Sequence, residues 1–106
     1  MTTMDHEEVL AWAEQARLRR AEIVAGVTEG IVSLAEVLAD RSDPLVGPIK
    51  VVVVAQAVPG VGKVAARRVL NAHGLEGARL ADLDDRTCAD LVEAVEAAND
   101  SQPRRR

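Results

Sequence analysis

The chain has 106 residues, of which 48% are hydrophobic, so it is long enough for one domain with an apolar core. Trp12 is its only aromatic residue and Cys88 its only cysteine, which argues against base stacking on aromatic side chains, a disulfide framework and a cysteine-based zinc site. The net charge is −4, no apolar run is as long as a membrane span, and residues 1–8 do not resemble a signal peptide. We therefore expect a soluble intracellular protein whose core consists of Ala, Val and Leu in close-packed helices.

The first predicted element is a long helix over about residues 7–27. This stretch contains no proline and is rich in Ala, Glu, Arg and Leu. Apolar residues recur along it at three- and four-residue intervals or multiples of them: Val9, Trp12, Ala16, Ile23 and Val27. Arg17 and Arg20 would be neighbours on this helix, with Arg19 on another side. The two arginines form either a solvated face paired with glutamates or a stripe that contacts phosphates.

A second, shorter helix is predicted from Ser33-Leu34-Ala35-Glu36, which has the form of a capping box. Asp43-Pro44 and Gly47-Pro48 then interrupt the chain. The four consecutive valines at positions 51–54 favour a buried strand on propensity alone. Because the rest of the chain offers no second strand to pair with them, we interpret this segment as a buried helix.

A hairpin is predicted next. Residues 58–62, Val-Pro-Gly-Val-Gly, form a tight turn, and a helix is expected from Lys63 to about Ala72. Gly74 ends that helix. With the valine segment, these residues make a helix-hairpin-helix-like unit over about residues 49–73.

The last helix is predicted over about residues 84–98, with Asp84 as its N-cap. The loop or short turn before it covers residues 75–83. The side chains expected on the buried side of this helix are Leu83, Cys88, Leu91, Val92 and Val95. Residues 101–106 form a basic tail, and we expect residues 1–100 to make a single helical domain.

Charge is distributed unevenly along the chain. Residues 1–40 carry a net charge of −5 and residues 74–100 a net charge of −6, whereas residues 41–73 carry +4 and the tail carries +3. Any surface that binds anions is therefore expected to be local.

The hairpin and the helix after it have a spacing that suits phosphate binding. Gly60 and Gly62 allow the backbone to turn with positive φ and leave no side chain between an amide and a ligand. Amides at the start of the helix can then point at a phosphate oxygen, assisted by the helix dipole. Val61 is expected to fill the core, and Ala66 to let two helices approach closely. The alternative is a turn with a structural role only.

Three cations accompany this hairpin. Lys63 and Arg67 are four residues apart and share a helix face, and Arg68 lies beside them. They are expected to contact neighbouring phosphates.

Other chemistry finds little support in the sequence. A nucleotide-binding P-loop is excluded because Ala57 and Val64 stand where that motif needs glycine and a hydroxyl residue. No paired-cysteine, serine-elbow or His-Glu-x-x-His motif occurs. Asp82, Asp84 and Asp85 are explained as helix caps and dipole partners, not as metal ligands. We predict no enzymatic activity, no cofactor, no metal and no small-molecule substrate.

Several blocks of the chain, taken in order, resemble the actinobacterial type of integration host factor. The blocks are RLRRAEI at 17–23, LAEVL at 34–38, IKV at 49–51, PGVGKV at 59–64 and LDDR at 83–86. The resemblance runs from about residue 11 to residue 94. It implies a small, monomeric, all-α nucleoid protein in which a helix-two-turns-helix unit binds the backbone of duplex DNA. It also implies binding that is largely independent of sequence and that can bend or compact the DNA.

One part of the family pattern is depleted. Before the last helix the family carries a pair of arginines and a third arginine two residues on. The matching residues here are Ala78, Arg79 and Ala81, followed by Asp82, so one arginine remains. Each lost phosphate contact lowers the slope of log K against log salt by about 0.9. The resemblance therefore implies a divergent, acidic member with a weaker or narrower DNA site.

The sequence as a whole predicts a cytoplasmic, nucleoid-associated protein that binds double-stranded DNA through phosphates. The residues expected to contact DNA are Gly60, Val61, Gly62, Lys63, Arg67, Arg68, Arg79, Arg17 and Arg20. The alternative is a protein-interaction module that keeps the fold and has lost strong DNA binding, with the acidic segment 74–100 contacting a protein partner.

Overall fold

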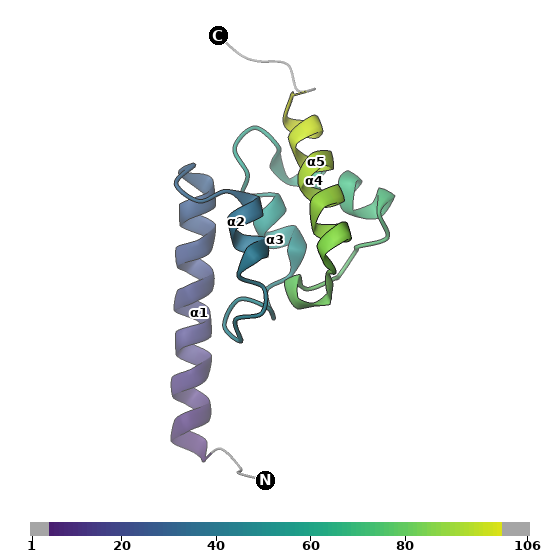
Figure 1. Ribbon diagram of the computed structural model, residues 1–106. Helices are drawn as coiled ribbons and strands as arrows, with labels where there is room; N and C mark the ends of the chain where they lie inside the picture. Colours follow the sequence, from purple (N-terminus) through teal and green to yellow (C-terminus); the bar gives the residue numbers. More distant parts are fainter. Residues whose placement is uncertain (1–4, 101–106) are drawn as a thin grey trace.

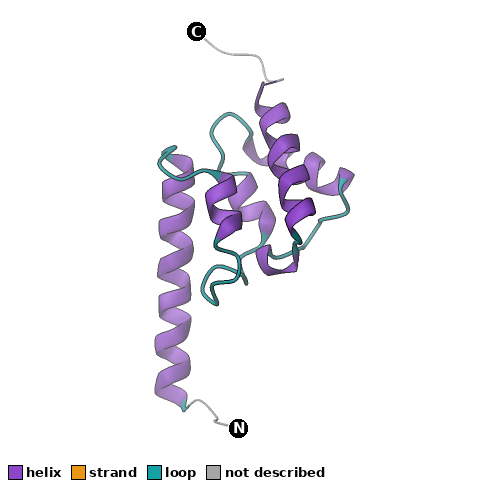
Figure 2. Cartoon of the chain, viewed as in Figure 1, coloured by secondary structure: helices purple, strands orange, loops and turns teal. Residues whose placement is uncertain are grey.

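The computed structural model describes residues 5–100, and the predicted basic tail at 101–106 lies outside this range. All regular elements in the described range are helical (Figure 2). They are α1 (His6–Thr28), α2 (Leu34–Ala39), α3 (Val51–Ala55), α4 (Gly62–Ala72), the 3-10 turn η1 (Leu80–Asp82) and α5 (Asp85–Asp100). The all-α prediction is confirmed. None of the described helices is both long and apolar enough to cross a membrane.

Helix α1 stands along one side of a cluster formed by the other helices (Figure 1). It contacts α3, which in turn contacts α4, while α5 packs against both α2 and α4. Only the second half of α1 lies against the cluster. Residues 5–15 are all exposed, including Val9 and Trp12, so the periodic apolar pattern at the start of this helix is not buried in the core.

The core is aliphatic, as the composition requires. Fully buried side chains come from every helix, and the largest are Val27, Leu38, Val46, Val51, Val54, Leu70, Leu80, Leu91 and Val95. Val61 and Ala66 are also buried, which confirms that Val61 fills the core and places Ala66 in it as well. Burial of this apolar area at roughly 25 cal/mol per Å² is the main favourable contribution to folding.

The valine segment is helical, as predicted. Val51 and Val54 are fully shielded from solvent, and α3 lies between α1 and α4. A helix of only five residues is not stable alone, because the hydrogen bonds of one turn do not offset the conformational entropy lost in forming it. Packing on two sides therefore overrides the strand propensity of valine.

Local signals set most of the helix ends. Ser33 Oγ accepts a hydrogen bond from the Glu36 amide at 3.1 Å, and Asp84 Oδ1 accepts one from the Thr87 amide at 2.7 Å. Both predicted N-caps are thereby confirmed, with α5 beginning one residue after Asp84. Gly74 has φ of +68°, in the left-handed region expected of a residue that ends a helix.

The segment before α5 contains the short turn that the sequence predicts and a bridge that it does not. Lys50 and Arg79 form an isolated antiparallel bridge, and η1 follows it directly. The Arg79 amide donates to Asp82 Oδ2 at 2.9 Å, and the Asp82 amide donates to the Arg79 carbonyl at 2.9 Å. These bonds close η1 on itself, while the hydrogen bonds from the Val51 amide to the Ala78 carbonyl and from the Leu80 amide to the Ile49 carbonyl hold the loop against the start of α3.

Candidate nucleic-acid interface

The glycine hairpin has the backbone geometry that the sequence predicts. Gly60 has φ of +84° and Gly62 has φ of +76°, a region that favours glycine. The two glycines differ in their surroundings. A Cβ on Gly60 would meet the Asn99 side chain of α5, whereas a Cβ on Gly62 would meet nothing within 4 Å. Gly60 thus permits close packing of α5, and Gly62 leaves open space above the hairpin.

The amides of the hairpin are not equivalent either. The Val61 amide donates to the Val58 carbonyl at 3.1 Å, so it is engaged within the turn. Helix α4 begins at Gly62, and no side chain in the described residues caps it. The amides of Gly62 and Lys63 belong to the first turn of the helix, where no intrahelical carbonyl is available to them. Both residues are exposed.

A groove lies between α1 and the α3 side of the molecule. It consists of two adjoining cavities of about 550 Å³ each, which share Arg20 and Val53. One is lined by Ala16, Arg17, Arg20, Leu45, Pro48, Ile49, Lys50, Val53 and Arg79; the other is lined by Arg20, Val24, Thr28, Val53, Gln56, Ala57 and Lys63. Neither lining includes an acidic side chain.

Four of the predicted cations therefore line one groove, although they come from distant parts of the sequence. Arg17 and Arg20 are contributed by α1, Lys63 by α4, and Arg79 by the loop before α5. Arg19 lies elsewhere, as predicted, with its guanidinium 3.9 Å from the Asp43 carboxylate. The predicted pairing of Arg17 and Arg20 with glutamates is absent from the residues that the structure describes.

The structure does not bring Arg67 and Arg68 into this groove. Arg67 lines a separate cavity with Glu76 and Gly77, and neither arginine lines the cavities that hold Lys63 and Arg20. Both are exposed on α4. Their predicted DNA contacts remain predictions, but they would have to lie beyond the groove.

Lys50 is the cation that the sequence analysis overlooked. It is the N-cap residue of α3 and lines the same cavity as Arg17, Arg20 and Arg79. Its place in the basic segment 41–73 was the available signal. That signal could not show that Lys50 lies opposite Arg79, because the bridge joins residues 29 positions apart.

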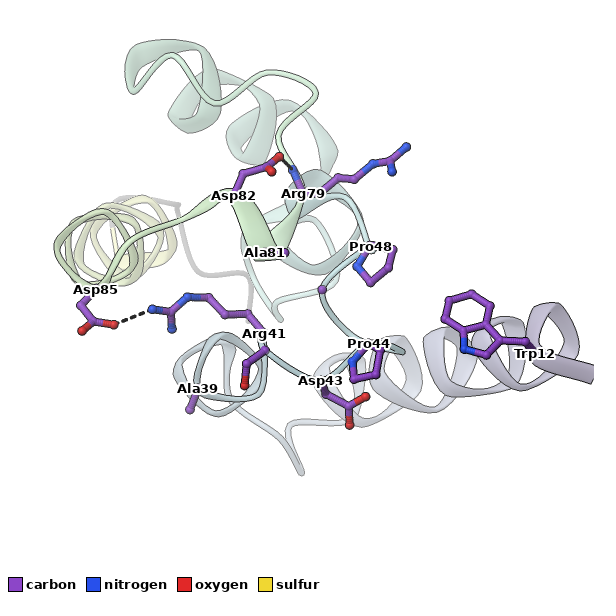
Figure 3. Close-up of a pocket in the computed structure, with 12 residues that line it drawn as sticks. Trp12, Ala39, Arg41, Asp43, Pro44, Pro48, Arg79, Ala81, Asp82 and Asp85 are labelled. Atoms are coloured by element: carbon purple, nitrogen blue, oxygen red, sulfur yellow. Dashed lines mark hydrogen bonds and ion pairs between the residues drawn. The ribbon is translucent and has the colours of Figure 1, made fainter. Parts of the chain in front are cut away.

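A larger cavity of about 870 Å³ adjoins the groove and has a mixed lining (Figure 3). It shares Pro48 and Arg79 with the groove and adds Trp12 from α1 together with three aspartates. Figure 3 shows the Arg79 side chain extending away from the Asp82 carboxylate, which accepts the backbone N–H of Arg79 instead. Arg79 therefore keeps its charge available to the groove side.

Arg41 at the rim of this cavity is a structural cation. Its guanidinium donates to the carbonyls of Leu38 and Leu83, each at 2.9 Å, and to the Asp85 carboxylate at 2.5 Å. The hydrogen bond to Asp85 raises the pKa of Arg41 above its usual value. Arg41 joins the end of α2 to the start of α5, which holds the loop that carries Arg79.

Asp84 gives the start of α5 a pH dependence that can be tested. Hydrogen bonds from Thr87 lower the pKa of Asp84 below its ordinary 3.8. Its contribution to stability is therefore present above pH 3.8 and is lost as the pH falls through the lowered pKa.

We expect Asp84→Asn to unfold at a lower temperature than the wild type at pH 7, and the difference between the two unfolding temperatures to shrink toward pH 3. Thermal unfolding followed by circular dichroism measures this, with Asp90→Asn as the control. A difference that stays constant with pH would contradict this role.

No group of histidine, cysteine and acidic side chains within residues 5–100 is arranged to hold a metal ion. Cys88 is buried on α5, and burial raises the pKa of its thiol. The site is thus a cationic groove next to a helix start that has positive-φ glycines.

Comparison with known proteins agrees with this geometry. The family model described as the S13-like H2TH domain matches residues 27–95, from the end of α1 through most of α5. The chain belongs to this family. The H2TH match covers the hairpin, the bridge and most of the groove. It leaves out Arg17 and Arg20, which lie on the part of α1 that precedes the H2TH domain.

A solved structure of sIHF bound to an 8-base-pair palindromic DNA is also similar to the chain. The two are 29% identical with a TM-score of 0.67, and the similarity covers 80% of this chain and 93% of that one. With the H2TH match, it confirms the resemblance to helix-two-turns-helix proteins of the integration-host-factor type. No curated protein matches the chain.

Proposed function

We propose that the chain binds double-stranded DNA through its phosphate groups, without enzymatic activity. The observation that carries this proposal is the groove, in which Arg17, Arg20, Lys50, Lys63 and Arg79 line a continuous surface free of acidic side chains. A protein with a net charge of −4 that concentrates its cations in this way has a local field that attracts a polyanion. The similarity to a DNA-bound protein supports duplex DNA as that polyanion.

The hairpin supplies a second element of the proposed interface. The amides of Gly62 and Lys63 would donate to one phosphate at the start of α4, where the helix dipole favours an anion. Lys63 would add its charge at the same place. Gly60 and Val61 would act indirectly, since one packs against α5 and the other has its amide engaged in the turn.

The groove would hold one backbone strand along α1. Phosphate contacts carry no base information, so binding would be largely independent of sequence. Because cations would neutralise one side of the duplex only, the DNA would bend toward the protein.

Arg67 and Arg68, exposed on α4, would contact phosphates that flank the groove. We propose that one copy of the chain, through residues 1–100, makes this interface in the cytoplasm as part of the nucleoid.

The salt dependence of binding tests this function. With Lys50 included, five groove cations contacting phosphates would give a slope of log K against log salt of about −4 to −5. Fluorescence anisotropy measures the affinity for a labelled duplex of about 20 base pairs. Repeating the titration at salt concentrations from about 50 to 200 mM gives the slope. Two duplexes of unrelated sequence should give the same values.

A protein-interaction module is the alternative, and the distribution of acidic residues favours it. The segment 74–100 has a net charge of −6, and its acids at Asp90, Glu93 and Glu96 are exposed along α5. Absence of duplex binding at tens of micromolar protein, at low salt, would reject the DNA proposal and favour this one.

A further inference from the structure

The bridge between Lys50 and Arg79 places two positive charges opposite each other. Its flanking hydrogen bonds run from the Val51 amide to the Ala78 carbonyl and from the Leu80 amide to the Ile49 carbonyl, each at 2.9 Å. This pattern makes Lys50 and Arg79 a non-hydrogen-bonded antiparallel pair, with Cα atoms about 4.5 Å apart and side chains closer than at the other kind of position. Like charges directly opposite each other destabilise such a pair.

Neither Lys50 nor Arg79 makes an ion pair within residues 5–99. Asp82, three residues after Arg79, accepts from the backbone of Arg79 and not from its guanidinium. The same cavity adds Arg17 and Arg20. Four cations thus line one cavity whose other lining residues are apolar.

The rest of the lining is apolar and supplies no counter-charge. Ala16, Leu45, Pro48, Ile49 and Val53 complete the cavity wall. The four cations are exposed, so salt screens both their mutual repulsion and their attraction for an anion, and both are largest at low ionic strength. Two backbone hydrogen bonds hold Lys50 opposite Arg79. Because neither bond involves the Lys50 side chain, a neutral residue at position 50 would keep both.

We propose that Lys50, Arg79, Arg17 and Arg20 form an oxyanion site that takes one phosphodiester group of the duplex backbone, and that this contact relieves the repulsion between Lys50 and Arg79. The inference rests on the proposed function and adds to it a specific DNA contact, Lys50, and a second phosphate site apart from the hairpin. Lys50 then has opposite effects in the two states. It lowers the stability of the free protein and raises the stability of the complex.

The variant Lys50→Gln, made in the full chain, tests the site with two measurements. Without DNA and at low salt, we expect its unfolding temperature to exceed that of the wild type. Removing a cation from a protein of net charge −4 would otherwise increase the overall charge imbalance, so a rise reports an unfavourable positive field at Lys50, from the facing cations and from the start of α3. With duplex, we expect binding about tenfold weaker and a salt slope smaller by about 0.9.

Two further variants serve as controls. Lys50→Arg keeps the charge and should retain the wild-type slope. Arg86→Gln removes one cation from an exposed position on α5 that lines neither cavity, so it should leave the slope unchanged and should not raise the unfolding temperature.

The outcomes separate this site from the function on which it rests. If the wild type fails to bind duplex, the proposed function is wrong. If the wild type binds and Lys50→Gln binds with the same affinity and slope, the function stands and the Lys50 site is rejected. A lower unfolding temperature for free Lys50→Gln would show that Lys50 stabilises the free protein and would also reject the Lys50 site.

Sodium phosphate is the last probe. If it stabilises the wild type more than Lys50→Gln while duplex binding is equal in both, the site takes small phosphates and not the DNA backbone.

Discussion

Replacing Arg20 and Lys63 together with glutamate is expected to abolish duplex binding while the protein stays helical. The two side chains are exposed and line the same cavity, from α1 and α4, so the change reverses the charge at the centre of the groove. Two lost charge-assisted contacts of about 1.5 kcal/mol each correspond to roughly a 100-fold loss of affinity, before repulsion of the phosphates is added. Fluorescence anisotropy gives the affinity, and far-ultraviolet circular dichroism gives the fold.

Single reversals separate local contacts from net charge. Arg20→Glu, Lys63→Glu and Arg86→Glu all change the charge by the same amount, but Arg86 lines neither groove cavity. We expect the first two to weaken binding by at least tenfold and the third to change it little. Equal losses in all three would mean that total charge controls binding and that the groove is not the interface.

Gly62→Val is expected to remove binding and to lower stability. The residue has φ of +76°, where a side chain costs about 1–2 kcal/mol and a β-branched one costs more. Its Cβ would project into open space at the start of α4, the place proposed for a phosphate. We expect binding to fall by more than tenfold at a temperature where the variant is folded, since the two first-turn amides would be blocked. Thermal unfolding and anisotropy together measure the two effects.

Gly74→Val is the matched control. Gly74 has φ of +68°, is exposed and would have nothing within 4 Å of an added Cβ, yet it lies at the other end of α4. It should lose stability like Gly62→Val and keep its affinity for duplex. Normal binding by Gly62→Val would refute the role of the backbone amides, even if the groove cations are correct.

The helices were predictable because their signals are local. Ser33, Asp84 and Gly74 each act on backbone groups within a few residues, so their types alone indicate where a helix begins or ends. The valines of α3 were harder, since their strand propensity is contradicted only by burial between two other helices. Lack of a pairing partner elsewhere in the sequence was enough to decide this case.

The groove could be predicted only in part. The uneven charge pointed to residues 41–73, but the cavities also draw on α1 and on Arg79. Helical spacing placed Lys63 and Arg67 on one face, whereas the structure has them lining different cavities. The bridge that sets Lys50 against Arg79 is a single residue pair with no periodicity, so nothing in the sequence could reveal it.

The exposed first half of α1 was also beyond sequence analysis. Val9 and Trp12 continue the same periodic pattern as Ile23 and Val27. Periodicity shows which face of a helix is apolar, but it does not show how far the partner surface extends. Here that surface ends before α1 does, and the pattern continues past it.

The position of Trp12 determines what optical spectroscopy can observe in this protein. It is the only aromatic residue, it is 39% exposed, and it lies on the half of α1 that leaves the cluster, so the core itself contains no fluorophore. Tryptophan emission therefore follows the fraying of one helix end, and its denaturation curve need not coincide with the melting of the core seen by circular dichroism. In a DNA titration the same residue becomes an advantage. Trp12 lines the cavity next to the groove, so quenching of its emission would report a duplex arriving at α1, without any added label.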